Sequence, residues 1–299
     1  MRKKIGGFLA VAIIGFLSWY LFIKPYDFAI SFKTKALPGV VKQSLKIWNI
    51  QQDSIQILEE KEEYLVENIY LEDTIHQYRW EMEPINDSIY RVTAYIKDLN
   101  HSLKNKLTIP FLQTQFEERT ARTVIDFKDQ LKDHLKNWKV TIEDESELKA
   151  TYCAYISVET TQLGKARGMM DNYPFLNSFL AKNGVPLNGS PFIEVTSWDK
   201  LTGTLRFDFC YPIDKTENLP SHPELKYREF KPRRALKAIY KGNYSTSDRA
   251  WYALLNYAQK ENINVEELPV EVFLNNPVAG GYELNWTAEV YMPIEIPNE

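Results

Sequence analysis

Apolar and polar positions between residues 150 and 295 repeat one order of elements twice. The first copy predicts a strand, a helix and two strands in TYCAYISV, YPFLNSFLAKNG, SPFIEV and GTLRFDFCYPI. The second copy predicts the same order in RALKAIYKG, SDRAWYALLNYAQKENI, LPVEVFL and YELNWTAEVYMPI. Sliding one copy over the other without a gap aligns Glu194 with Glu271. Repeats over about 150–213 and 227–295 predict a pseudo-twofold domain with a ligand cleft between them.

Residues 26–140 predict a separate α+β unit. Alternation at Phe28, Ile30 and Phe32 indicates a half-buried strand, and LPGVVKQSLKIWN predicts a short helix. Four more strands are expected in SIQILEE, EYLVENIYLE, IHQYRWEME and SIYRVTAYIKD. An apolar stripe at helical spacing predicts a long helix over about residues 112–138. The acidic segment VTIEDESELKA, residues 140–150, is interpreted as a solvated linker.

The chain opens with an uncharged stretch, Ile5 to Ile23. Nineteen residues at about 1.5 Å each reach roughly 28 Å, close to the hydrocarbon core of a bilayer. We therefore expect a single-pass transmembrane anchor over residues 1–25. The basic residues Arg2, Lys3 and Lys4 favour a cytoplasmic N-terminus with the other domains outside, although lysines follow the span as well. A cleavable signal peptide is the alternative, but no small-x-small cleavage site is present.

Composition narrows the class of protein. With 299 residues the chain can form two domains, and 44% hydrophobic and 13% aromatic residues argue against disorder. The formal net charge of −4 gives no basic footprint, so we expect no nucleic-acid partner. The four histidines are scattered, which predicts no metal site, and no cofactor motif occurs. Cys153 and Cys210 lie on predicted strands and either pair in an oxidising compartment or remain buried thiols.

The second repeat carries an ordered set of residues that points to a family. Gly242 and Tyr244 follow its first strand, Trp251 and Leu254 lie on its helix, and EVFLNNP and TAEVYMPI complete it. Residues 148–296 resemble the GyrI-like family, also known as the effector-binding domain of AraC-type transcription regulators. The resemblance implies that the central cleft binds small, often cationic or aromatic molecules. Some members of that family hydrolyse strained cyclopropane-containing compounds.

The order of elements in residues 26–140 also resembles a known family. One strand, a short helix, an antiparallel sheet and a long helix are similar to the helix-grip fold of the SRPBCC superfamily, whose members are START-like and polyketide-cyclase-like. YRWEMEP…DSIYRVTAYI resembles its central hairpin. The resemblance implies an apolar pocket between the sheet and the helix. The alternative is that Trp80, Met82 and Phe127 fill a core. The expected fold is thus α+β: a transmembrane helix, a helix-grip domain and a duplicated β-α-β-β effector-binding domain.

Glu271 is the leading candidate for the site. A period of two places Glu271 and Phe273 on one face of the strand LPVEVFL. A carboxylate beside aromatic rings in a low dielectric would hold a cationic ligand. Glu194 is its counterpart in the first repeat. Further aromatic residues are either pocket walls or core: Tyr155, Tyr240, Tyr244, Trp251 and Tyr291.

Two functions follow from these residues. The favoured one is a membrane-anchored protein that binds a hydrophobic or cationic small molecule in the inter-repeat cleft without catalysis. The alternative is a hydrolase in which Glu271 activates water and a tyrosine such as Tyr155 assists the leaving group. If Glu271 binds a cation, Glu271→Gln should weaken binding and change folding little.

Overall fold

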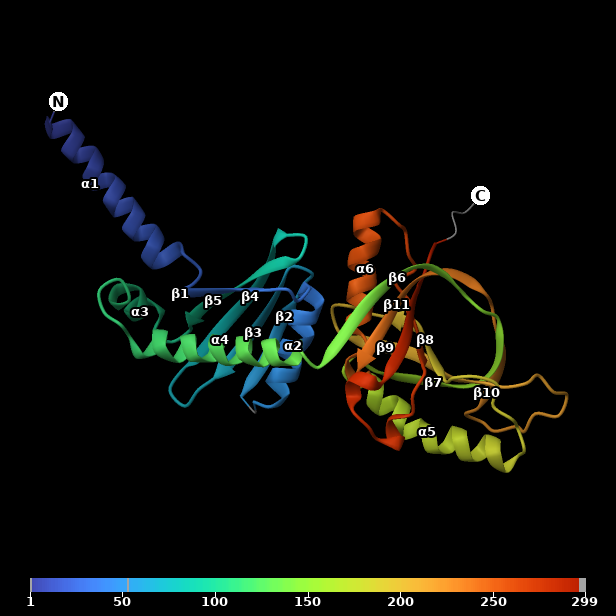
Figure 1. Cartoon of the computed structure of the whole chain (residues 1–299). Helices are drawn as coiled ribbons and strands as arrows, with labels where there is room; N and C mark the ends of the chain where they lie inside the picture. The colour runs from blue at the N-terminus through green and yellow to red at the C-terminus, as the bar shows by residue number, and fades with distance from the viewer. Residues whose placement is uncertain (1, 53, 296–299) are drawn as a thin grey trace. The chain divides into compact units, whose positions relative to one another are not determined.

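The protein divides into two compact units, each built on its own antiparallel sheet. A computed structural model of the chain describes residues 2–52 and 54–295 (Figure 1). The first unit ends at Lys132 and the second begins at Asp133. The first unit holds a sheet of five strands and the second a sheet of eight. The α+β class predicted from the sequence is therefore confirmed.

The transmembrane helix predicted over Ile5 to Ile23 is contradicted. Helix α1 (Arg2–Ser18) has 17 residues, and the chain then continues as a π-helix, η1 (Trp19–Ile23). The Lys24 N–H donates to the Trp19 carbonyl, five residues back, at 2.8 Å. This is the hydrogen bond of a π-helix, whereas an α-helix bonds four residues back. Within residues 2–52 and 54–295, no helix is long and apolar enough to cross a bilayer. The predicted anchor over residues 1–25, the membrane partner and the single-pass localisation are therefore wrong.

The first unit follows the predicted order of a strand, a short helix, a sheet and a long helix. Its sheet has the order β1-β5-β4-β3-β2. The elements are β1 (Phe28–Thr34), α2 (Pro38–Ile50), β2 (Ile55–Glu60), β3 (Tyr64–Tyr70), β4 (Ile75–Asn86), β5 (Ile89–Asp98), α3 (Ser102–Thr108) and α4 (Gln115–His134). Pro38 suits the first turn of α2, because that turn needs no donor from its N–H.

Aromatic rings pack between this sheet and its helices. Phe127 on α4 lies 5.2 Å from Trp80 of β4 and 5.9 Å from Trp48 of α2, measured between ring centroids, with its ring edge toward both. Trp80 is fully buried, as the alternation along β4 requires. These contacts favour the filled core over the apolar pocket among the two alternatives that the sequence left open.

A carboxylate is buried within this aromatic core. Glu67 on β3 is 0% exposed, and its two oxygens accept hydrogen bonds from Asn49 Nδ2 at 2.6 Å and Trp80 Nε1 at 2.8 Å. Burial raises the pKa of the Glu67 carboxyl above its usual 4.5, and the two hydrogen bonds oppose this rise only in part. Among the described residues, Asn49 Oδ1 has no partner. Exchanging the amide oxygen and nitrogen of Asn49 would let a protonated Glu67 donate to that oxygen.

We therefore expect Glu67→Gln to stabilise the first unit at neutral pH. Because the pKa is raised in the folded state, the native protein holds a proton that the unfolded chain releases above about pH 4.5. The free energy of unfolding should then fall as the pH rises, by at most about 1.4 kcal/mol per pH unit. The substitution removes the titrating group and with it this slope. Denaturant titrations between pH 5 and pH 8, followed by hydrogen exchange of β3, measure it.

The exposed neighbour Glu63 provides the control for this substitution. Glu63→Gln also removes one carboxylate, at a position in contact with solvent. It should leave the pH dependence of the wild type intact. Equal slopes for wild type and Glu67→Gln would show that Glu67 is ionised in the folded protein.

The second unit repeats the order β-α-β-β twice, as its apolar pattern predicted. The first repeat comprises β7 (Thr151–Thr161), α5 (Lys165–Lys182), β8 (Phe192–Trp198) and β9 (Thr204–Pro212). The second comprises β11 (Arg233–Gly242), α6 (Arg249–Glu261), β12 (Val270–Phe273) and β13 (Thr287–Pro293). Short 3₁₀ turns lie in the second repeat: η2 (Tyr244–Thr246), η3 (Pro277–Ala279) and η4 (Glu283–Asn285).

The eight-stranded sheet joins the repeats at its centre. Its order is β10-β7-β9-β8-β12-β13-β11-β6, so the pairing of β8 with β12 connects the two copies. The outer strands are β6 (Trp138–Leu148) and β10 (Lys226–Phe230). Strand β6 covers most of the acidic segment that was interpreted as a linker, and it pairs with β11 over its whole length. Its backbone bonds to β11 outweigh the acidic composition that indicated a loop.

The two faces of this sheet carry different residues. The face that packs on α5 and α6 holds the main core, which includes Leu176, Phe207 and Leu254. The other face holds a smaller cluster with Cys153 and Cys210, which are both buried and free. Of the two alternatives for the cysteines, this structure has the buried thiols.

Candidate functional site

A buried ion pair ties the two repeats together. Lys165, at the start of α5, donates from Nζ to both oxygens of Glu271 on β12, at 2.7 and 2.8 Å. Ser247, from the second repeat, is a third member, 2.5 Å from the lysine and 2.6 Å from the carboxylate. Lys165, Ser247 and Glu271 are all 0% exposed. We call these three residues the inter-repeat joint.

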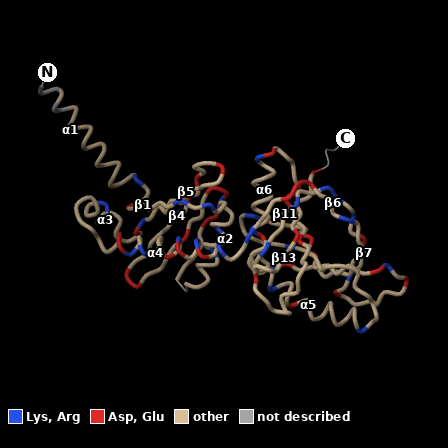
Figure 2. Tube along the Cα trace, in the orientation of Figure 1, with Lys and Arg blue, Asp and Glu red and all other residues tan. Residues whose placement is uncertain are grey.

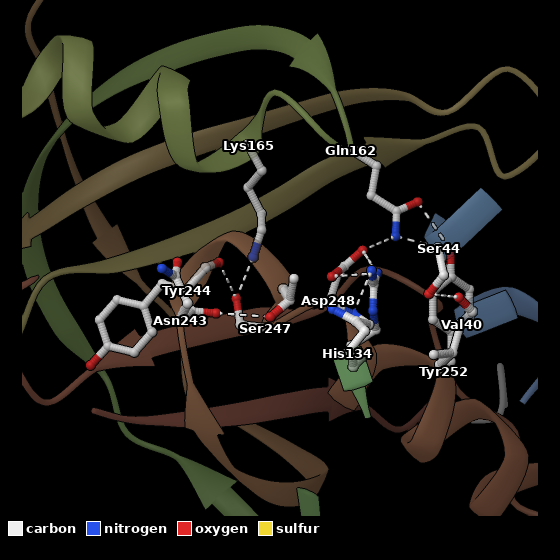
Figure 3. Close-up of polar contacts among 12 residues, drawn as sticks. Val40, Ser44, His134, Gln162, Lys165, Asn243, Tyr244, Ser247, Asp248 and Tyr252 are labelled. Carbon is white, nitrogen blue, oxygen red and sulfur yellow. Dashed lines mark hydrogen bonds and ion pairs between the residues drawn. The ribbon is translucent and has the colours of Figure 1, made fainter. Parts of the chain in front are cut away.

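The turn before α5 makes a second connection. Figure 3 shows Lys165 and Gln162, both from the first repeat, reaching toward Ser247 and Asp248 of the second. The Gln162 amide donates to Asp248 at 2.5 Å and to the Tyr252 hydroxyl at 2.9 Å. The local sequence thus places an amide and an ammonium group against the other repeat.

Strand register decides where the two predicted glutamates point. In the β8–β12 pair, Glu271 lies opposite Ile193 and Glu194 lies opposite Val270. Ile193 belongs to the core under the helices, whereas Val270 belongs to the cluster on the other face. Because directly paired residues share a face, Glu271 and Glu194 lie on opposite faces of the sheet. The ungapped alignment of the repeats is therefore one residue out of register at this strand.

The charge of Glu271 is already neutralised by Lys165. A carboxylate with both oxygens on an ammonium group, and no solvent exposure, offers no free site to an external cation. The aromatic Trp251 also contacts this lysine, with Nζ 5.1 Å from the ring centroid. Lys165 therefore takes the position that the sequence argument assigned to a cationic ligand.

A cavity lies beside the joint, between α5, the sheet and the loops of the second repeat. Its volume is ≈ 470 Å³. Of the predicted residues, Tyr244 and Phe273 line it, with ring centroids 4.8 Å apart. Its further apolar lining includes Met169, Met170, Phe209, Tyr211 and Trp286. Among the described residues that line it, none carries a charge.

Tyr244 fixes one wall of this cavity. Its hydroxyl donates to the Thr287 carbonyl at 2.8 Å and accepts from the Asn275 N–H at 3.2 Å. Burial raises the pKa of Tyr244 to about 12, so the phenol stays protonated at neutral pH. The Ser247 hydroxyl of the joint also lies 2.9 Å from the Tyr244 carbonyl, which connects this wall to the ion pair.

The remaining predicted residues lie elsewhere. Glu194 forms ion pairs with Arg228 and Arg233 on the opposite face, where Arg228 also lies 4.5 Å from the Tyr155 ring centroid. On the same face, the Tyr291 hydroxyl donates to Glu289 at 2.8 Å. Tyr240 and Trp251 are buried in the main core. The structure thus brings together Tyr244 and Phe273 at the cavity, places Glu271 in the joint, and separates the rest.

Sequence reasoning missed several residues of this site. Lys165 and Ser247 carry no motif, and their partner Glu271 is 106 and 24 residues away along the chain. The cavity residues Tyr173, Asn177 and Tyr211 also escaped notice. The helical spacing of Met169, Tyr173 and Asn177 places them along one side of α5, and this was the available signal.

Comparison with known proteins agrees with the fold. The family described as the GyrI-like small molecule binding domain matches residues 144–295. The match covers half of the chain, and the chain therefore belongs to that family, as the resemblance seen in the sequence predicted. No curated protein matches it.

Several solved structures are similar to this chain at low identity and low TM-score. The EcmrR C-terminal domain is 13% identical with a TM-score of 0.44, over 53% of this chain and 98% of that one. SAV2435 bound to tetraphenylphosphonium is 10% identical with a TM-score of 0.39, over 52% and 94%. A hydrolase from Listeria innocua is 11% identical with a TM-score of 0.35, over 55% and 98%. Structural similarity at such low identity and TM-score does not assign a function to this chain.

Net charge alone does not exclude a nucleic-acid partner, so the expectation that there is none is not kept. A similar structure is EcmrR in a complex with DNA, at 13% identity and a TM-score of 0.44 over 64% of this chain and 70% of that one. The DNA partner in that complex is a property of EcmrR. In the present chain, acidic and basic residues are interspersed over both units (Figure 2).

The joint predicts a large effect of Glu271→Gln on stability, in contrast to the small effect expected from the sequence. The substitution leaves a buried ammonium group without a counter-charge, which should cost roughly 3–5 kcal/mol. Lys165→Met should cost a similar amount. The double variant removes both charges and should recover much of the loss. Chemical denaturation of the four proteins measures the coupling energy.

A surface ion pair in the same unit is the matched control. Glu159 and Arg206 lie 3.0 Å apart with exposed side chains. Glu159→Gln should change the free energy of unfolding little, because solvent screens the pair. Additive losses in the Lys165 and Glu271 double variant would show that the joint does not act as a unit.

Proposed function

We propose that the GyrI-like domain binds a small molecule in the ≈ 470 Å³ cavity beside the inter-repeat joint. The observation that carries this proposal is the lining, which combines aromatic and methionine side chains with several amides and hydroxyls. Ligand sites in proteins have this volume and this composition. The two methionines, Met169 and Met170, add side chains that adapt to the shape of a ligand.

Both repeats contribute to this cavity. Helix α5 and strand β9 supply residues of the first repeat, including Ala166 and Phe209. The second repeat supplies Tyr244, Phe273 and the segment 274–278. The joint holds α5 against β12 and so sets the spacing of these walls. This position supports the inter-repeat cleft predicted from the duplication.

Hydrolysis receives less support from the geometry. Under that alternative, Glu271 would activate water, but both of its oxygens are bound to Lys165 and it is fully buried. The proposed helper Tyr155 lies on the opposite face of the sheet. A general base must reach the proton that it abstracts. Binding without catalysis is therefore the function that we favour.

The proposal for the first unit is a helix-grip domain similar to the SRPBCC superfamily. Its support is the order of elements and the packing of α4 against the sheet through Phe127. The domain ranges that we propose are 26–140 for this domain and 148–296 for the GyrI-like domain.

The binding proposal is tested with N-phenylnaphthylamine, an uncharged dye whose fluorescence rises in apolar surroundings. We expect saturable binding to the full chain and a loss of at least about tenfold in Ala166→Phe, because the larger ring fills the cavity. Ala181→Phe places the same ring on the exposed side of α5 and should bind the dye as the wild type does.

The difference between the two variants identifies the site, since α1 also offers apolar surface to the dye. Melting curves of both variants check that the fold is retained. If the dye binds Ala166→Phe and the wild type equally well, the cavity is not a binding site.

A further inference from the structure

We propose that this cavity selects an uncharged molecule with an apolar body and a hydrogen-bonding head, which Tyr173, Asn177 and Tyr211 recognise. The inference rests on the proposed function and specifies the class of ligand. It departs from the expectation of a cation, for which Glu271 was the reason.

The electrostatics of the cavity favour an uncharged ligand. Among the described lining residues there is no Asp, Glu, Lys or Arg. In the joint, the charges of Lys165 and Glu271 offset each other at a separation of 2.7 Å. A charged ligand would lose its hydration without gaining a counter-charge, which disfavours burial of either sign. An uncharged ligand avoids this loss.

Three polar side chains that line the cavity can form hydrogen bonds with a ligand: Tyr173, Asn177 and Tyr211. Tyr173 and Asn177 lie one turn apart on α5, so their side chains share a face. The Tyr173 hydroxyl accepts from Asn276 Nδ2 at 3.0 Å, which leaves its own proton available. Among the residues that the structure describes, the buried Tyr211 hydroxyl has no partner, whereas Asn177 is exposed to solvent and makes no hydrogen bond within the protein.

Tyr211 is the most informative of the three residues. It is only 3% exposed, and a buried hydroxyl without a partner lowers stability. Burial raises the pKa of Tyr211, and the nearby Tyr173 adds to the rise, so the phenol stays protonated. A protonated phenol can donate to a neutral acceptor such as an amide carbonyl. A ligand that supplies this acceptor satisfies a group that the protein leaves unpaired.

Three probes of one shape test the charge selection. They are naphthamide, naphthoate and naphthylmethylammonium, substituted at the same ring position, which are uncharged, anionic and cationic at neutral pH. Calorimetric titration of the full chain should show the amide binding at least about tenfold more tightly than either ion, since neither charge finds a partner. Preference for the cation or the anion, or equal binding of all three, would overturn the inference.

Two near-isosteric variants test the recognising residues. Tyr211→Phe and Asn177→Leu should each weaken naphthamide by about threefold to tenfold, the effect of one hydrogen bond, and should leave unsubstituted naphthalene unchanged. Tyr211→Phe should also melt at the same temperature as the wild type or higher, because no protein partner is lost. Equal effects on naphthamide and naphthalene would refute recognition of the head group.

The proposed function and this inference fail in different ways. If Ala166→Phe still binds N-phenylnaphthylamine as the wild type does, the cavity itself is excluded and the inference falls with it. If Ala166→Phe abolishes dye binding but the three naphthalene probes compete equally, the cavity binds ligands without the selection proposed here.

Discussion

The architecture of the second unit depends on one buried ion pair, Lys165 with Glu271. Each partner is costly to bury alone, so the two repeats are stable in the arrangement that brings the ammonium and the carboxylate together. Ser247 satisfies both groups further at 2.5 and 2.6 Å. Because α5 begins at Lys165, the pair also fixes where that helix starts relative to β12. A contact between distant segments thereby sets the geometry of the cavity wall.

The same pair determines the electrostatics of the site. In a duplicated domain with a carboxylate on its central strand, a cation is the natural ligand to expect. Here the chain supplies that cation from its own helix. The cavity that remains beside the pair is uncharged, and its walls are aromatic rings, thioethers, amides and hydroxyls. Under the binding that we propose, selection among ligands depends on shape and on unpaired hydrogen-bonding groups such as the Tyr211 hydroxyl, rather than on attraction between opposite charges.

The opposite face of the sheet shows how much depends on a single position of register. Glu194 and Glu271 occupy equivalent places in the ungapped alignment, yet one pairs with arginines on one face and the other with Lys165 under the helices. A shift of one residue reverses the face of every side chain on a strand. The identity of the residues was therefore insufficient, and the pairing of β8 with β12 decided their environments.

The sequence by itself determined most strands and helices of both units, because local periodicity records which face of a strand or helix is buried, but it missed α3, β10 and the first two turns of α5. It predicted the duplication, the order of strands and helices in residues 26–140, and the side of β12 on which Glu271 and Phe273 lie. It misjudged the acidic segment of β6 and the N-terminal helix, where composition or hydropathy was the only signal. The tertiary structure alone decided that Lys165 neutralises Glu271 and that Tyr173, Asn177 and Tyr211 lie around one cavity. Lys165 and Glu271 lie 106 residues apart, and α5 meets β9 and β12 only in the packed domain, so no local pattern records these contacts.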